Sequence, residues 1–118
     1  MKLAVAIADE HAMPNAFVVW RGIEASIQKA ANLGYDGIEL ALKSSQEVDA
    51  EQLSRWLSKA DMEVSCISTG QVYAALGLMF TDPNPEKRQQ VEKVFREIID
   101  LAERFGVRIQ HIRGPEYH

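Results

Sequence analysis

Four stretches with strand character are separated by three stretches with helical periodicity, and this order constrains the fold more than any other feature of the chain. The expected strands are residues 3–8, 36–42, 63–69 and 107–112. Between them, apolar residues recur every three or four positions, as on the buried side of a helix. Strands that alternate with helices predict a parallel sheet with right-handed crossovers. The expected fold class is therefore α/β, with the element order βαβαβαβ.

Turn and cap residues indicate where the three helices begin and end. Gly34 is expected at the C′ position of the first helix. Asp49, with Gln52 three residues later, resembles a capping box at the start of the second helix. Pro85 is expected in the first turn of the third helix, where a missing N–H costs nothing, and Gly106 is expected to end that helix.

The two faces of the first two strands differ in composition. One face carries Leu3, Val5, Ile7, Ile38, Leu40 and Leu42. The other carries Ala4, Ala6, Ala8, Gly37, Glu39 and Ala41. Strands of a doubly wound sheet are covered by helices on both faces and are apolar throughout. This pattern instead predicts one layer of helices and a (β/α)8 TIM-barrel type, with the small or polar face lining the interior or a pocket.

The length of the chain predicts about half of such a barrel. The chain has 118 residues, whereas a complete barrel needs about 250. We therefore expect a single domain, residues 1–118, corresponding to the N-terminal half of a TIM barrel. Such a half has two unpaired edge strands, which favour association. The prediction is a homodimer formed through the open sheet edges, unless the rest of the barrel is missing from this sequence.

Charge and cysteine content narrow the possible partners. The net charge of −4 comes from interspersed acidic and basic residues, which does not favour nucleic acid or a membrane surface. The apolar N-terminus is too short for a membrane span or a complete signal peptide, so a cytoplasmic protein is expected. The single cysteine, Cys66, cannot form an internal disulfide and is interpreted as a buried, unreactive thiol.

Several segments resemble one known family. Residues 33–40 (LGYDGIEL) are similar to the helix-to-strand signature of the xylose-isomerase-like sugar-phosphate isomerase/epimerase family. Residues 64–73 (VSCISTGQVY), 80–83 (FTDP), 98–106 (IIDLAERFG) and 111–114 (HIRG) follow in the order of that family. The resemblance covers nearly the whole chain.

The resemblance implies a barrel enzyme that interconverts ketoses and aldoses or epimerises ketoses. It further implies a divalent metal ion in the full-length enzyme, which polarises a carbonyl and a hydroxyl while carboxylates move a proton. In the family, the carboxylates and most metal ligands lie on strands five to eight. Those strands have no counterpart in these 118 residues. No metal ligand or catalytic residue is therefore assigned, and the chain alone is expected to be inactive.

Substrate-binding candidates follow from position, because barrel active sites form at the carboxyl ends of the strands. The candidates are Glu39, Thr69, Gly70, Gln71, His111 and Arg113, with Ser68 and the loop residue His11 beside them. Their expected ligand is a small sugar or sugar phosphate.

Each of these candidates also has a structural interpretation. Glu39 either recognises a substrate hydroxyl or forms an ion pair inside the barrel. Residues 68–71 either bind a ligand or form a polar turn. Arg113 either binds phosphate or carboxylate bidentately or makes an ordinary salt bridge. His111 is more often a barrel histidine than a ligand, because no second ligand accompanies it at suitable spacing.

Two other classes of protein remain as alternatives. The first is a non-catalytic half-barrel fragment or engineered assembly. The second is a small-molecule binding module that uses Glu39, Thr69 and Arg113 without turnover. Ligand binding without metal dependence would favour the binding module.

Overall fold

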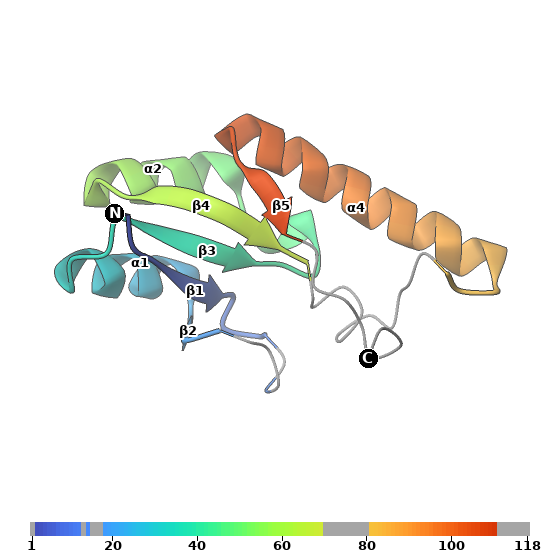
Figure 1. Cartoon of the computed structure of the whole chain (residues 1–118), viewed down its shortest axis with the longest axis horizontal. Helices are drawn as coiled ribbons and strands as arrows, with labels where there is room; N and C mark the ends of the chain where they lie inside the picture. Colours follow the sequence, from blue (N-terminus) through green and yellow to red (C-terminus); the bar gives the residue numbers. More distant parts are fainter. Residues whose placement is uncertain (1, 13, 15–17, 70–80, 111–118) are drawn as a thin grey trace.

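The structure, a computed structural model, describes residues 2–12, 14, 18–69 and 81–110. Its elements are β1 (Ala4–Ala8), β2 (Trp20–Arg21), α1 (Ile23–Asn32), β3 (Gly37–Ala41), η1 (Ser45–Glu47), α2 (Ala50–Ala60), β4 (Glu63–Ser68), α4 (Pro85–Phe105) and β5 (Arg108–Gln110). The strands form one sheet in the order β2-β1-β3-β4-β5, and all neighbours are parallel. Figure 1 shows the arrowheads of β1, β3, β4 and β5 pointing toward the same end of the sheet. The predicted α/β class and half-barrel order are confirmed.

One face of the sheet packs against the helices and forms the main core. Ile7, Leu40 and Ile67 lie at the same level of β1, β3 and β4, and each is fully buried. The helices meet this face with apolar residues at helical spacing. These are Ile23, Ile27 and Ala30 from α1, Leu53 and Leu57 from α2, and Val91, Ile98, Leu101 and Ala102 from α4. The predicted branched face is therefore the helix-facing side.

The predicted helix ends are confirmed by their cap geometry. Gly34 and Gly106 both have positive φ, and they follow the last turns of α1 and α4. The Asp49 carboxylate accepts hydrogen bonds from the backbone N–H groups of Glu51 and Gln52. These bonds satisfy donors that an uncapped helix start would leave unpaired. Pro85 occupies the first turn of α4, as predicted.

The short strand β2 was not predicted from the sequence. Trp20 and Arg21 pair with Ile7 and Ala8 of β1, so this edge of the sheet is not fully open. The prediction of an unpaired β1 edge is therefore wrong for its carboxyl half. The Trp20 ring meets the Tyr35 ring edge to face at 6.2 Å between centroids, so Trp20 is a packing residue. The Lys29 ammonium lies 4.8 Å from the centre of the Trp20 ring.

A β-bulge interrupts the pairing of β3 with β4. Ile38 is level with Val64, but the next residue, Glu39, is level with Cys66. Ser65 is the extra residue, and its hydroxyl donates to the Ile38 carbonyl oxygen at 3.1 Å. A bulge of this kind shifts the alternation of side chains by one position. Cys66 therefore lies level with Glu39 rather than among the core residues that face the helices.

Among the described helices, none is long and apolar enough to cross a membrane. The longest, α4, carries charged side chains along its exposed side.

Candidate functional site

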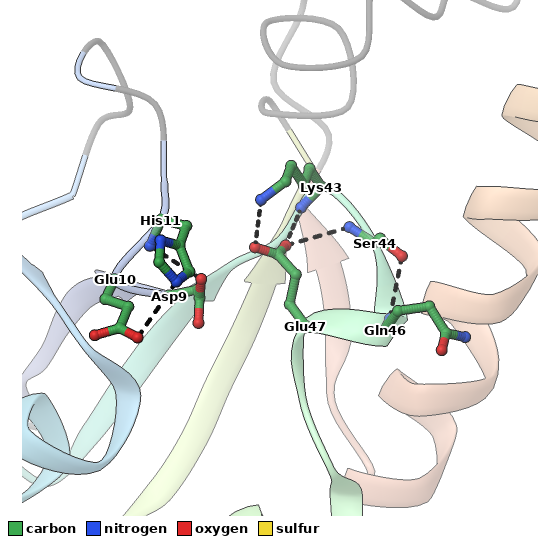
Figure 2. A network of polar contacts seen from close by, with 7 residues as sticks. All are labelled: Asp9, Glu10, His11, Lys43, Ser44, Gln46 and Glu47. Carbon is green, nitrogen blue, oxygen red and sulfur yellow. Dashed lines mark hydrogen bonds and ion pairs between the residues drawn. The ribbon is translucent and has the colours of Figure 1, made fainter.

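The carboxyl ends of β1, β3 and β4 meet at one end of the sheet. Ala8, Ala41 and Ser68 lie level with one another across these three strands. The chain then continues into polar segments, residues 9–11 after β1 and residues 43–47 after β3. Figure 2 shows these two groups of side chains at the ends of their strands. Active sites of parallel α/β proteins form at this end, because several loops converge there.

Small side chains line the sheet face opposite the helices, which is called the inner face below. Ala6, Glu39 and Cys66 form one row across it, and Ala8, Ala41 and Ser68 form the next. Ala8 and Ala41 pack with Ala12 and Val18 in a separate small cluster. The first loop therefore covers this end of the inner face, where Ala8 and Ala41 are 0% and 5% exposed.

Glu39 lies on the inner face. Among the described residues on that face, it is the predicted site residue whose side chain is ionisable. Its side chain is half-buried, and it makes no hydrogen bond or ion pair within the described ranges. The predicted alternative of a structural ion pair therefore has no partner among those residues. A partly desolvated carboxylate without a partner is costly. Such a group is suited to accept hydrogen bonds from ligand hydroxyls.

The other predicted site residues fall into two groups. Ser68 and Thr69 follow the inner-face row and are 4% and 1% exposed, so their hydroxyls are enclosed. The Ser68 carbonyl oxygen accepts a hydrogen bond from the Leu42 backbone N–H. The remaining candidates lie outside the described residues: Gly70, Gln71, His111 and Arg113.

His11 lies in the first loop, beside Asp9 and Glu10. The Asp9 carboxylate accepts a hydrogen bond from the His11 backbone N–H at 3.0 Å. The His11 Nε2 atom lies 3.4 Å from the Glu10 carboxylate, and both side chains are more than 70% exposed. A polar contact with such exposure contributes little to stability.

A carboxylate in η1, the turn that follows β3, was not predicted from the sequence. The Glu47 side chain is 8% exposed and accepts hydrogen bonds from the backbone N–H groups of Lys43 and Ser44. Its second oxygen accepts a bond from the Lys43 ammonium at 2.8 Å. The Ser44 hydroxyl in turn accepts from the Gln46 N–H (Figure 2). The pattern of Ser44 with Glu47 three residues later is a capping box, which could have revealed η1 in advance.

This arrangement fixes the loop beside the inner face. Glu47 uses both of its oxygens, so Lys43 and Glu47 form a locally neutral pair. The Ser45 hydroxyl also donates to Glu97 of α4 at 3.3 Å. We interpret these contacts as structural support for the carboxyl end of β3 rather than as a reactive group.

The described residues do not fit the divalent cation that the resemblance implies. Within that part of the chain, no group of three or more His, Cys, Asp and Glu side chains is placed to hold a metal ion. A stable divalent site needs several such ligands converging on one point. No chemical step is therefore derived through a metal here.

Four main parallel strands, one helix layer and a polar cluster at the carboxyl ends define half of a (β/α)8 barrel. A family model described as xylose isomerase-like TIM barrel matches residues 27–118. The chain belongs to this family. The resemblance inferred from residues 33–40 and the later segments is thereby confirmed.

Comparison with solved structures gives the same fold. The chain is similar to the crystal structure of AP endonuclease, family 2, from Brucella melitensis, with a TM-score of 0.65 and 16% sequence identity. The match covers 97% of this chain and 42% of that chain, so this chain spans less than half the length of that neighbour. Comparison with curated proteins finds no match.

Proposed function

We propose that this chain provides the substrate-binding first half of a barrel that isomerises or epimerises a sugar or sugar phosphate. The observation that carries the proposal is Glu39. Its carboxylate is half-buried on the inner face and has no partner among the described residues. Its neighbours Ala6 and Ala41 have small side chains, and sugars present hydroxyl groups that can donate to a carboxylate.

The remaining candidates extend the same site in this proposal. Ser68 and Thr69 supply hydroxyl groups at the end of β4. Gly70 and Gln71 follow in sequence, while Arg113 is the proposed anchor for a phosphate group and His111 its neighbour. An arginine suits that role because its planar fork binds phosphate bidentately.

Turnover needs groups that are not assigned to this chain. Membership of the family supports an isomerase or epimerase. The resemblance of this chain to the family implies that the proton-moving carboxylates and most metal ligands lie on later strands. In this proposal, Glu39 and its neighbours bind and orient the sugar, and the later strands supply the proton transfer. The location proposed for the protein is the cytoplasm.

The experiment compares two glutamate variants of the full chain. Binding of a panel of ketoses and ketose phosphates is measured by calorimetry, and their isomerisation is followed with Mg²⁺ or Mn²⁺ present and absent. Glu39→Gln removes the inner-face charge, whereas Glu24→Gln changes an exposed residue of α1 and serves as the control. We expect Glu39→Gln to weaken sugar binding about tenfold or more, since hydrogen bonds to charged groups are the strong ones. Equal binding by both variants, or no binding of any sugar, would contradict the proposal.

Two further outcomes are informative. Sugar binding that is independent of metal, without turnover, would favour a binding module. The structural neighbour is named an AP endonuclease, so a DNA duplex with an abasic site is included as a third substrate. The net charge of −4 does not favour contact with a phosphate backbone, and we expect no cleavage.

A further inference from the structure

We propose that Lys43 is a further ligand-binding residue at the carboxyl end of the sheet, where its ammonium group donates hydrogen bonds to uncharged oxygen atoms of a sugar. This role rests on the proposed function and deepens it, because it names the part of the sugar that the side chain recognises. Hydroxyl and carbonyl oxygens accept hydrogen bonds, and an ammonium group is a donor only. Lys43 was not among the site residues predicted from the sequence.

Lys43 is the first side chain beyond β3 on the side of the inner face. Ala41 lies on that face, level with Ala8 and Ser68. Leu42 is fully buried in the core that faces the helices, and its backbone N–H still donates to the Ser68 carbonyl oxygen at 3.0 Å. The alternation of side chains therefore continues through Leu42 and directs Lys43 toward the inner face.

The first loop covers Ala41 but leaves Lys43 accessible. Ala12 and Val18 of this loop pack in one cluster with Ala41, which is 5% exposed. The Lys43 side chain, two residues further along, is 25% exposed. A ligand that approaches the carboxyl end of the sheet therefore meets Lys43 before it meets the covered Ala41.

Glu47 holds the Lys43 side chain in one place. The Lys43 Nζ atom lies 2.8 Å from one oxygen of the Glu47 carboxylate, and the other oxygen accepts from the Lys43 backbone N–H at 2.7 Å (Figure 2). A free lysine side chain loses rotamer freedom when it binds a ligand. That loss is smaller for Lys43, because the ion pair already restricts its side chain.

The ammonium group is the more accessible member of this pair. The Glu47 side chain is 8% exposed, so its carboxylate is nearly enclosed, whereas the Lys43 side chain is partly open to solvent. Within the part of the chain that the structure describes, the Glu47 carboxylate is the one acceptor of the Lys43 ammonium. An ammonium group has three N–H donors, so two of them remain for the oxygen atoms of a ligand.

Support of the turn alone does not account for an ammonium group at this position. The Glu47 carboxylate already accepts from the backbone N–H groups of Lys43 and Ser44, and these bonds hold the turn. A nearly buried ion pair adds little to stability compared with apolar side chains of similar size, because desolvation offsets the attraction. What the pair supplies beyond the turn is a fixed hydrogen-bond donor at the carboxyl end of the sheet.

The neighbouring charges favour an uncharged ligand group over an anion. The Lys43–Glu47 pair has no net charge, and the first loop, which leaves the adjacent strand β1, carries Asp9 and Glu10. Because like charges repel, carboxylates at this end of the sheet oppose the approach of a phosphate group. The hydroxyl and carbonyl oxygens of a ketose meet no such repulsion. A phosphate group, where the sugar has one, is expected at Arg113, as proposed above.

The first test compares two lysine variants of the full chain by calorimetry with neutral ketoses. Lys43→Met removes the ammonium group, whereas Lys59→Met removes the same charge from an exposed position in the last turn of α2. We expect Lys43→Met to weaken the binding of neutral ketoses about tenfold or more, because hydrogen bonds to charged groups are the strong ones. Lys59→Met should bind them as the wild type does. Inorganic phosphate should bind equally to both variants.

The second test separates ligand binding from the stability of the turn. The double variant Lys43→Met/Glu47→Gln leaves no unpaired charge in the turn, and circular dichroism with urea denaturation verifies that it is folded. It should lose ketose binding as Lys43→Met does. In the wild type, lysines are labelled with acetic anhydride and located by mass spectrometry. A bound ketose should slow the labelling of Lys43 and leave that of Lys59 unchanged, which a merely structural ion pair would not do.

The outcomes distinguish this proposal from the proposed function. If Glu39→Gln weakens ketose binding while Lys43→Met behaves like Lys59→Met, the role of Lys43 is overturned and the proposed function stands. If only Lys43→Met weakens ketose binding, the role of Lys43 stands and Glu39 loses its proposed role. An effect of Lys43→Met confined to inorganic phosphate or to ketose phosphates would reveal an anion site and overturn the proposal. Binding of no ketose contradicts both.

Discussion

The backbone of Gly37 lies so close to Glu63 that a Cβ atom on Gly37 would come within 2.6 Å of the Glu63 carbonyl oxygen. This close approach is where β3 meets the start of β4, just before the bulge. Backbone atoms of two paired strands have little freedom to move apart. Gly37 is thus required by the space between two strands rather than by its own backbone angles.

Gly37→Ala is expected to lower the free energy of unfolding by about 1–3 kcal/mol, as overpacking does. Urea denaturation measures the change. Gly34→Ala is the control, because a Cβ there meets nothing within 4 Å and its cost comes only from the positive φ of 89°. A smaller loss for Gly37→Ala than for Gly34→Ala would contradict the contact described above.

The Glu47 carboxylate is expected to stabilise the loop after β3. Glu47→Gln removes the charge and one acceptor from a side chain that is 8% exposed, so the Lys43 ammonium loses its partner. We expect a loss of about 1–3 kcal/mol in the free energy of unfolding. Glu103→Gln, an exposed residue of α4, should change it by less than about 0.5 kcal/mol. Equal losses in the free energy of unfolding for the two variants, measured by urea denaturation, would show that the Lys43–Glu47 pair does not stabilise the loop.

Ser26 is expected to be a residue whose replacement stabilises the protein. Its hydroxyl is buried on α1 and has no hydrogen-bond partner among the residues that the structure describes. Ser26→Ala should raise the free energy of unfolding by about 1 kcal/mol from the removed polar group, in addition to about 0.5 kcal/mol from helix propensity. Ser58→Ala, at an exposed position of α2, measures the propensity gain alone. If the thermal unfolding temperature rises equally in both variants, the Ser26 hydroxyl does not destabilise the folded protein, and this prediction is wrong.

The Lys2–Glu63 ion pair is expected to give a pH-dependent stability in the alkaline range. The hydrogen bond from Lys2 to Glu63 at 2.9 Å, together with the charge of Glu63, raises the pKa of Lys2 above 10.5. A raised pKa in the folded state means that the stabilisation is complete below pH 10.5 and is lost as the pH rises through the folded pKa.

Unfolding of wild type and Lys2→Met is compared from pH 7 to pH 11. The two should differ by a small, constant amount up to pH 10 and converge at higher pH. Added salt should reduce the difference, because both side chains are exposed. A difference that grows with pH would contradict the assigned direction of the shift.

The main elements could be predicted because each carries its own local pattern. The sequence places Ile38 and Leu40 on one face of a strand and Glu39 on the other. It also places Asp49 before an amphipathic helix. The structure has both arrangements. For the first three strands, the predicted ends differ from the observed ends by at most one residue, as for the strand expected at residues 3–8 and found at Ala4–Ala8.

The features that could not be predicted depend on contacts between distant residues. β2 is too short for any periodicity, and it is defined by its pairing with β1, beside which Val19 and Gly22 donate to β1 carbonyl oxygens. The bulge at Ser65 is visible only once β3 and β4 are paired. At the candidate site, Glu39 could be placed on the inner face from alternation, whereas the burial of Glu47 required knowledge of the fold.

The bulge at Ser65 makes the length of β4 tolerant of one lost residue. Before it, Val64 faces the helices, and after it Ile67 does so, while Cys66 and Ser68 face inward. Because Ser65 is the extra residue, its deletion would restore a regular strand in which Cys66, Ile67 and Ser68 keep their partners and their faces. One codon could therefore be lost here during evolution without a change in the lining of the barrel mouth. One codon gained after the bulge would instead reverse the side chains that follow it, unless a second bulge absorbed the added residue.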